Sequence, residues 1–231
     1  MINTTNWGGL STEETGVPFC SLLWVEDDLP LSDWVRQAFE DDGWTVLLAH
    51  GKAAAIELME KTIPHHFPCV ALLDLGLPPR PSVPDEGLSL LRCLVRDWPV
   101  LRATVLTGQN DHAIGQQAVR DGAFDFLVKP TSLREMRRAV QRAAWFSQQA
   151  SDLLMQGQVH LTLTAALSEG VKEVSDGVAE QLIRHVLYTT RFNVTAAARM
   201  LGLEREQLYY HMKKYGIQRP LHFEIPSPLR S

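Results

Sequence analysis

Residues 70–78, with the sequence VALLDLGLP, constrain the fold more than any other stretch of this 231-residue chain. Four apolar residues run into Asp74, a pattern typical of a strand buried in a parallel sheet. In open α/β sheets the chemistry takes place beyond the carboxyl ends of the strands, so Asp74 is either a reactive group or a metal ligand. Because Gly76 follows it, Asp74 is alternatively a turn residue or a helix N-cap.

Other apolar runs also end in polar residues. Residues 20–25 lead into Glu26 and Asp27, residues 101–106 into Thr107, and residues 124–128 into Lys129. A further strand is predicted at 45–49, and helical periodicity predicts helices at 32–43, 52–61, 88–98, about 111–120, and from Pro130 to about 150. This alternation predicts an α/β fold, a doubly wound five-stranded parallel sheet with helices on both faces.

Each polar residue at a strand end has an ordinary explanation by itself, because carboxylates and threonine cap helices and lysine is usually solvated. Helix capping and solvation do not readily explain why polar residues follow four of the predicted strands. Three carboxylates at one edge of a sheet would repel one another unless a divalent cation lay among them, and oxygen ligands suit Mg²⁺. A lysine and a threonine opposite them would bind an anion. The pattern indicates transfer of a phosphoryl group onto an aspartate.

Residues 20 to about 145 resemble the receiver domain of bacterial two-component response regulators. The matching segments are WVEDD at 24–28, LLDLGLP at 72–78, VLTG at 105–108 and FLVKP at 126–130. The resemblance implies the following roles: Asp74 is the phosphoacceptor, Glu26, Asp27, Asp74 and the backbone carbonyl of Gly76 hold Mg²⁺, Thr107 and Lys129 contact the phosphoryl oxygens, and Phe126 is the switch aromatic. A strand aromatic in the core is the alternative for Phe126. The loop at 78–87, with four prolines, is longer than in the family.

Residues 193–217 form the informative part of the last third. Asn193 or Thr195 can cap a short helix, and Gly202 permits a tight turn after it. In the next helix an inward face is predicted for Leu208, Met212 and Tyr215, which leaves Glu206, Gln207, Tyr210, Lys213 and Lys214 in solvent. Two short helices joined in this way predict a helix-turn-helix whose second helix enters the major groove. The alternative is a plain helical hairpin used for dimerisation.

The segments NVTAAARMLGL and LYYHMKKYGI are similar to the Fis-type helix-turn-helix of Fis and NtrC-like activators, over about residues 178–217. The resemblance implies that Arg205, Gln207, Tyr210 and His211 lie at or near base edges, and that Asn193, Thr195, Lys213 and Lys214 hold phosphates. Glu204, Tyr210 and His211 depart from the family's usual residues. The chain lacks the G-x-x-x-x-G-K-[ST] motif of the NtrC-like ATPase, so it resembles the short PrrA/RegA/ActR-type regulators.

Charge and cysteine content bear on partners and location. The net charge is −5, but residues 176–231 carry about +3 and the remainder about −8, an asymmetry that indicates a polyanion partner. The sequence contains no apolar stretch long enough to span a membrane. Cys20, Cys69 and Cys93 lie in apolar surroundings and are predicted to be reduced, which favours the cytoplasm.

We therefore expect an N-terminal tail at 1–18, a receiver domain at 19–147, a linker at 148–176, a small all-α Fis-type domain at 177–220 and a C-terminal tail at 221–231. The predicted function is that of a response regulator transcription factor that is phosphorylated by a sensor histidine kinase, dimerises and binds double-stranded DNA; RNA polymerase is a further candidate partner. A phosphorylation-independent architectural DNA-binding protein is the alternative. An aspartyl-phosphatase-type enzyme needs a general acid where the chain has Gly76, so we expect no enzyme.

Overall fold

The structure is a computed structural model, and it describes residues 21–61, 68–79, 84–108, 112–155, 158, 170–190 and 192–219. Within these ranges, no helix combines the length and the apolar character needed to cross a membrane. The predicted tails, Cys20 and much of the predicted linker lie outside the described residues.

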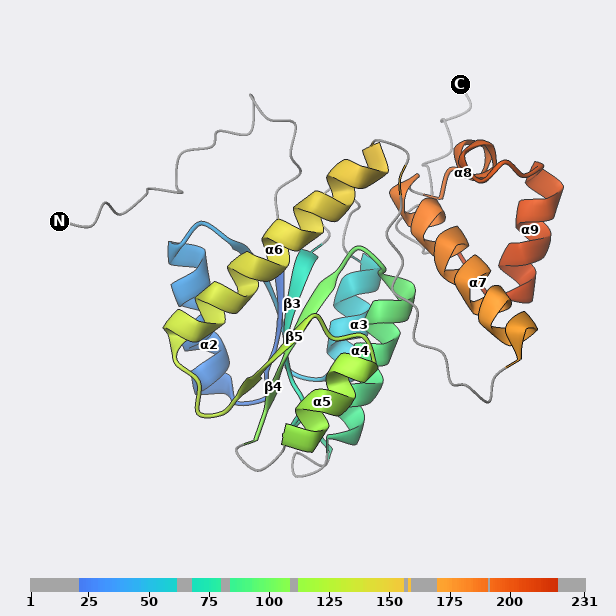
Figure 1. Cartoon of the computed structure of the whole chain (residues 1–231). Helices are drawn as coiled ribbons and strands as arrows, with labels where there is room; N and C mark the ends of the chain where they lie inside the picture. The colour runs from blue at the N-terminus through green and yellow to red at the C-terminus, as the bar shows by residue number, and fades with distance from the viewer. Residues whose placement is uncertain are drawn as a thin grey trace, which may run out of the picture.

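The receiver part is a parallel sheet with helices on both faces (Figure 1). Its elements are β1 (Ser21–Val25), α2 (Leu29–Asp41), β2 (Thr45–Ala49), α3 (Lys52–Lys61), β3 (Pro68–Asp74), α4 (Asp85–Asp97), β4 (Arg102–Thr107), α5 (His112–Arg120), β5 (Asp125–Val128) and α6 (Leu133–Met155). The five strands lie in the order β2-β1-β3-β4-β5. The predicted doubly wound five-stranded parallel sheet is confirmed.

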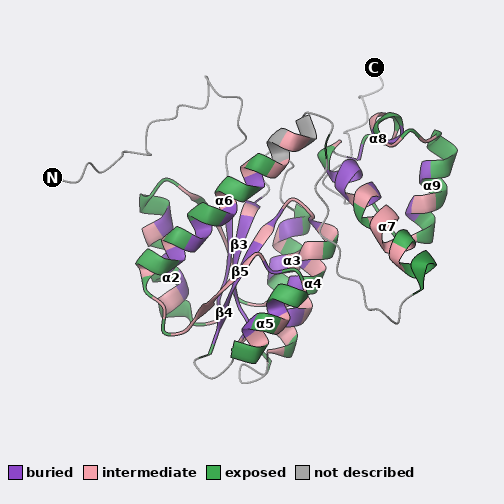
Figure 2. Ribbon diagram, in the orientation of Figure 1, coloured by how far each residue is buried: buried purple, intermediate pink, exposed green. Residues whose placement is uncertain are grey.

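The sheet divides the apolar core into two layers. Figure 2 shows the buried strands in the centre of the receiver, between helices with exposed outer faces. On one face, Trp24 and Leu72 pack with residues of α2 and α6; on the other, Leu23 and Leu73 pack with residues of α3, α4 and α5. Neighbouring strand residues therefore point into opposite layers, and the central strands read as continuous apolar runs because both faces are covered.

Strand register brings the predicted site residues to one edge. Asp74 pairs with Leu106 on β4, so it lies beside Thr107, and Thr107 in turn pairs with Val128 on β5. The backbone N–H of Lys129 donates to the carbonyl oxygen of Thr107 at 2.7 Å. Because all strands are parallel, their carboxyl ends share one edge of the sheet.

The observed helices are longer than the sequence predicts at several ends. α4 begins at Asp85, so the assignment of residues 85–87 to the proline-bearing loop was wrong. Asp85 and Glu86 form its first turn, where acidic side chains favour the positive end of the helix dipole. α6 continues to Met155, which places its last turns within the segment predicted as a linker.

Cys69, on β3, is disulfide-bonded, whereas Cys93 on α4 is free. The prediction of reduced thiols is therefore wrong for Cys69. Spacing along the chain does not reveal which sulfur atoms meet in space, so this bond left no signal in the sequence. The cytoplasmic location loses the support that it drew from reduced cysteines.

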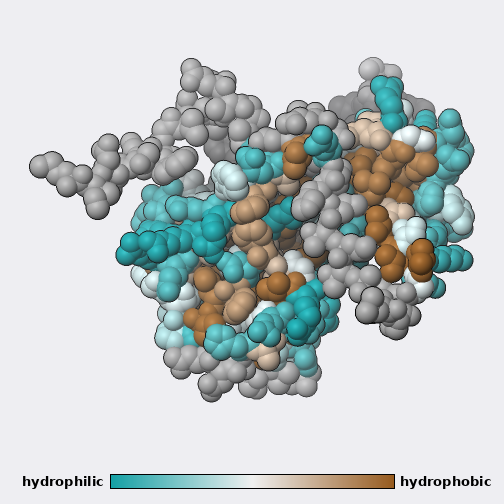
Figure 3. Space-filling view, viewed as in Figure 1, coloured by the Kyte–Doolittle hydropathy of each residue, from teal (hydrophilic) through white to brown (hydrophobic). Residues whose placement is uncertain are grey.

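In the part of the chain that the structure describes after the receiver, the helices are α7 (Val171–Thr189), α8 (Val194–Leu201) and α9 (Arg205–Lys214). The Asn193 side chain caps α8 by accepting from the Ala196 N–H at 3.1 Å, and Gly202 ends the helix at φ 65°. A left-handed residue at this position is unstrained because glycine has no Cβ. Leu208 and Met212 are buried, which confirms the predicted inward face of α9. Apolar side chains gather over these helices (Figure 3).

Gly87 allows α4 to lie against the backbone that follows Asp74. A Cβ at Gly87 would lie 2.4 Å from the Cα of Leu75, well inside van der Waals contact. The obstacle is backbone, which cannot turn aside as a flexible side chain can. The first turn of α4 is thereby held against the loop that carries the candidate site.

We expect Gly87→Ala to destabilise the fold by about 1–3 kcal/mol, because either α4 or the loop must move. Gly177→Ala is the matched control: Gly177 lies in α7, and a Cβ there would meet no described atom within 4 Å. That change should stabilise the protein by up to about 1 kcal/mol. Urea unfolding of both variants measures the difference, and equal stabilities would contradict the close packing of α4.

Candidate functional site

The carboxyl ends of β1, β3 and β5 bring Glu26, Asp74 and Lys129 together. Lys129 Nζ lies 2.8 Å from Asp74 Oδ2 and 3.3 Å from Glu26 Oε2. Asp27 supplies a third carboxylate, and one oxygen from each acid lies within 4.8 Å of the others. These residues and Thr107 line one open pocket of about 580 Å³. Residues that are as much as 103 positions apart in sequence therefore share one site.

Glu26 is the most perturbed acid of the cluster. Its side chain is 2% exposed. Burial, followed by repulsion from Asp74, raises the pKa of Glu26 to about 7, although Lys129 opposes the shift. Near neutral pH this carboxyl is therefore poised between its two protonation states. Any additional cation in the pocket would favour the ionised form.

Lys129 supplies the positive charge of the pocket. Burial by itself lowers the pKa of Lys129, but hydrogen bonding and attraction to Asp74, and then to Glu26, outweigh burial and raise it. The ammonium group therefore stays protonated and lies among the carboxylates. Its side chain is 33% exposed, so it also faces the open side of the pocket.

Thr107 contributes a buried hydroxyl. Among the described residues, its Oγ1 has no hydrogen-bond partner. The two oxygens of Asp74 are already engaged, because Oδ1 accepts from the Gly76 N–H at 3.1 Å and Oδ2 contacts Lys129. An unpaired buried hydroxyl is costly, and an anion entering the pocket would satisfy it.

The donor set fits Mg²⁺. This ion takes carboxylate oxygens and keeps part of its water shell, and an open pocket with three adjacent carboxylates offers both. With all three acids ionised, Lys129 leaves the cluster two negative charges in excess, which a divalent cation would balance. The carbonyl of Gly76 as a further ligand stays a prediction.

Phe126 is half-buried on β5, with its ring against α5. A Cβ at Gly115 would lie 2.5 Å from the ring, and the His112 ring meets it edge-on at 6.5 Å between centroids. Phe126 packs against the apolar core, which supports the core interpretation; its role as a switch stays a prediction. Sequence reasoning missed Gly115, although an isolated glycine in a helical pattern is a signal of close packing.

Sequence reasoning also missed His50, which follows β2. Its Nδ1 lies 3.0 Å from the carbonyl oxygen of Glu26. A carbonyl oxygen can only accept, so Nδ1 carries the proton. The contact supports the backbone of an acidic residue in the pocket, and no motif in the sequence pointed to it.

The predicted DNA-contacting residues fall into two groups in the structure. The first group is exposed and makes no side-chain hydrogen bond or ion pair with another described residue: Thr195 on α8, and Arg205, Tyr210 and Lys213 on α9. Tyr210 is 65% exposed. These side chains are available to a ligand that approaches the outer face of α9.

The second group already has structural partners. Asn193 caps α8, and the Gln207 side-chain oxygen accepts from the Glu204 N–H at 2.9 Å as part of a capping box. The His211 ring stacks on Tyr215 with centroids 5.8 Å apart, and Lys214 pairs with Asp176 at 2.8 Å. Glu204, which departs from the family pattern, is the N-cap of α9. Contacts of these residues with DNA stay a prediction.

Comparison with known proteins assigns both parts of the chain to protein families. The model of the response regulator receiver domain matches residues 22–141, and that of bacterial regulatory proteins of the Fis family matches residues 180–215. This chain belongs to the response regulator receiver family and carries a Fis-family module after its receiver domain. The predicted resemblances to both are confirmed, whereas the closer likeness to PrrA/RegA/ActR-type regulators stays a prediction.

Two curated relatives are transcriptional regulators by name. The C4-dicarboxylate transport transcriptional regulatory protein DctD of Rhizobium meliloti is 26% identical over 167 residues, which cover 72% of this chain and 34% of DctD. The transcriptional regulatory protein TrcR of Mycobacterium tuberculosis is 31% identical over 163 residues, 68% of this chain and 58% of TrcR. The chain thus spans about a third of one relative and somewhat over half of the other.

A solved structure of NtrX from Brucella abortus has a TM-score of 0.53 and 21% identity; the match covers 71% of this chain and 34% of that one. This likeness concerns the fold alone.

Without Mg²⁺, we expect the contribution of Glu26 to the free energy of unfolding to fall as pH rises from about 4.5 to 7. In this range folded Glu26 holds a proton that the unfolded chain has released, because burial raises its pKa to about 7. Glu26→Gln should therefore raise stability at pH 8, by on the order of 2 kcal/mol, and change it little at pH 5. Mg²⁺ binding should weaken.

Urea unfolding at the two pH values and Mg²⁺ titration measure these effects. Glu40→Gln, an exposed change on α2, is the control and should alter neither. A stability gain of the same size at both pH values would contradict the raised pKa of Glu26.

Proposed function

We propose that this protein is a response regulator transcription factor that a sensor histidine kinase phosphorylates on Asp74. The observation that carries the proposal is the contact of Lys129 with Asp74 in a pocket that also holds two further acids and the unpaired hydroxyl of Thr107. The same chain continues into a Fis-family module with an exposed second helix. A carboxylate that can accept a phosphoryl group and a helix that can bind DNA, on the same chain, support the proposal of a regulator controlled by phosphorylation.

The proposed reaction is transfer from a phosphohistidine. A carboxylate oxygen of Asp74 forms a bond to phosphorus while the P–N bond breaks, and the imidazole leaves with the electron pair and takes up a proton. Lys129 Nζ and Thr107 Oγ1 would contact the phosphoryl oxygens, and Glu26, Asp27 and Asp74 would hold Mg²⁺. Mg²⁺, when bound, supplies positive charge against the incoming phosphoryl oxygens. Phosphorylation would add up to about two negative charges at Asp74.

The DNA-binding part of the proposal concerns α8 and α9. Arg205, Gln207, Tyr210 and His211 would reach base edges, and Asn193, Thr195, Lys213 and Lys214 would contact phosphates. In a homodimer, two copies of α9 about 34 Å apart would read a roughly palindromic site. The face of β5 and its flanking helices would pair the two chains.

The remaining parts of the proposal concern organisation and location. The receiver would extend over residues 19–147 and the DNA-binding domain over 177–220; the observed α7 begins at Val171, before this boundary. The protein would act in the cytoplasm, with RNA polymerase as a further partner.

We expect Asp74→Asn to abolish the gain in DNA affinity that beryllofluoride, a phosphoryl mimic, produces in the wild-type chain. The amide cannot accept the mimic, whereas the fold should persist because the change keeps the shape of the side chain. Fluorescence anisotropy with a duplex selected by the wild-type chain measures affinity. Asp33→Asn, an exposed change on α2, is the control and should respond normally. A full response of the Asp74 variant would reject the switch at Asp74, whereas the absence of any response in the wild-type chain would favour the architectural alternative.

We expect Lys213→Ala to weaken binding to all duplexes about equally and to reduce the slope of log K against log[salt] by about 1, because one phosphate contact is lost. Lys61→Ala removes the same charge from α3, where the side chain is 72% exposed, and should leave the slope unchanged. Salt titrations of DNA binding measure both slopes. Equal slopes for Lys213→Ala and wild type would place Lys213 away from the DNA backbone.

A further inference from the structure

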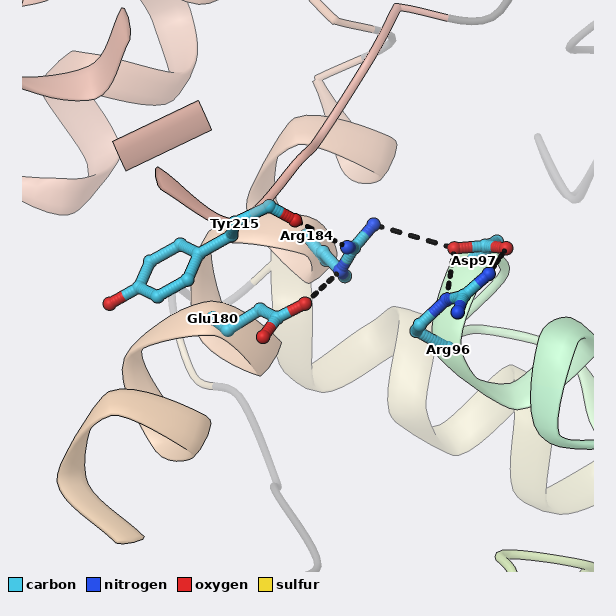
Figure 4. Close-up of polar contacts among 5 residues, drawn as sticks. All are labelled: Arg96, Asp97, Glu180, Arg184 and Tyr215. Carbon is cyan, nitrogen blue, oxygen red and sulfur yellow. Dashed lines mark hydrogen bonds and ion pairs between the residues drawn. The ribbon is translucent and has the colours of Figure 1, made fainter. Parts of the chain in front are cut away.

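Arg184 on α7 joins three parts of the chain (Figure 4). Its Nη1 lies 3.4 Å from Asp97 Oδ1 at the end of α4, and its Nη2 donates to the carbonyl oxygen of Tyr215 at 3.0 Å. Its Nε donates to Glu180 one turn earlier in α7 at 2.8 Å. With only 13% of its side chain exposed, Arg184 links the receiver, α7 and the end of α9 through one guanidinium group.

The location of Asp97 in α4 favours contacts between its carboxylate and arginine side chains. Asp97 is the last residue of α4, where the negative end of the helix dipole disfavours a carboxylate. Two arginines offset this: Arg96 binds both oxygens of Asp97, at 2.9 and 2.7 Å, and Arg184 binds from the other domain. The carboxylate is thus better placed when α7 is docked than when it is not.

An apolar interface surrounds the ion pair. Trp98 at the end of α4 is 6% exposed, and Tyr188 and Phe192 from the α7 segment are 8% and 5% exposed. All three belong to one continuous apolar cluster that runs from the receiver into the C-terminal helices. Burial, and next the nearby charge of Asp97, raise the pKa of the Tyr188 hydroxyl. The receiver thus alters the environment of a side chain on α7.

The burial of His185 on α7 also depends on the contact between α7 and the receiver. His185 is 5% exposed. Burial, followed by the positive charge of Arg102 at the start of β4, lowers the pKa of His185 to about 4. A histidine on α7 is therefore neutral and shielded beside a residue of the receiver, a state that would change if the domains separated.

The interface lies on the edge of the receiver opposite to the candidate phosphoacceptor. Arg102 begins β4, whereas Thr107 ends it within the acidic pocket. α4 spans the distance: Pro84, which precedes it, lines the acidic pocket, and Asp97 ends it at α7. α4 and its N-cap Pro84 therefore reach from the acidic pocket to α7.

The docked arrangement leaves the outer face of α9 open. Arg205, Tyr210 and Lys213 remain exposed while α7 is held against the receiver. The interface instead restrains the C-terminal end of α9, because Arg184 also binds the carbonyl oxygen of Tyr215, the C-cap of that helix. Docking therefore restricts where the helix points without covering it.

We propose that the Asp97–Arg184 contact is an interdomain latch that fixes the direction of α9 relative to the receiver and does not mask it. The DNA-binding helices then move with the receiver as one body. When two receivers pair, the latch sets how the two copies of α9 are placed. This part of the inference rests on the proposed function, whereas the docking itself does not.

The docking is tested with the full chain by reaction of histidines with diethyl pyrocarbonate, followed by mass spectrometry. His185 should react slowly in the wild-type chain, and exposed His112 serves as the internal reference. Asp97→Lys should speed the reaction of His185 about tenfold by local opening of the interface. Lysine suits the end of α4, so the receiver should stay folded.

Two variants control for the charge change. Asp121→Lys breaks another pair of an α4 arginine, Arg92–Asp121 at 2.9 Å, which lies within the receiver. Arg96→Gln leaves the Asp97–Arg184 pair in place. Neither should change the reaction of His185. The latch would be overturned if His185 reacted at the same rate in the Asp97→Lys chain as in the wild-type chain. It would also be overturned if His185 reacted as fast in the Asp121→Lys chain as in the Asp97→Lys chain.

DNA binding separates a latch that orients α9 from a contact that masks it. Without beryllofluoride, Asp97→Lys should bind the selected duplex no more tightly than wild type. With beryllofluoride it should bind about tenfold more weakly than wild type, because the two helices are no longer preorganised. A gain without beryllofluoride would identify a mask, and an undiminished response would show that orientation is not used; either overturns the proposal. A wild-type chain that ignores beryllofluoride would contradict the proposed function and leave the result for His185 standing.

Discussion

The arrangement of the site depends on one ammonium group. Lys129 Nζ lies within 3.3 Å of oxygens on both Asp74 and Glu26. Burial and repulsion from Asp74 raise the pKa of Glu26, and the charge of Lys129 opposes that shift. A buried charge is tolerated only when it is paired, and Lys129 supplies the pairing charge for the buried Glu26. Replacement of this contact by a phosphoryl group would change the balance of charge throughout the pocket.

The rest of the receiver transmits the geometry of this pocket through packing. Gly87 lets α4 lie against the backbone of Leu75, one residue beyond Asp74, and α4 ends at Asp97, where Arg184 binds. Closely packed elements shift together and do not deform gradually. A small movement at the start of α4, close to Asp74, therefore has a direct mechanical route to α7.

Much of the fold and site could be predicted because the signals are local. Apolar runs that stop at Glu26, Asp74, Thr107 and Lys129 mark strand ends, and parallel topology then requires these ends to share an edge. The helix-turn-helix was equally accessible, since Gly202 and the spacing of Leu208 and Met212 act within a few residues. The prediction for Cys69 was wrong because a disulfide depends on which sulfur atoms meet in space. The prediction for residues 85–87 was wrong because the prolines before them were taken to extend the loop as far as Gly87.

The sequence by itself determined which residues can form the pocket and which can form the two short helices, because periodicity and turn chemistry are properties of neighbouring residues. Only the tertiary structure decided that Glu26 is buried enough for its pKa to rise to about 7 and that Gly115 receives the Phe126 ring. It also decided that Arg184 spans two domains. Burial and contact between distant residues depend on how whole elements pack, and no short stretch of sequence carries that information.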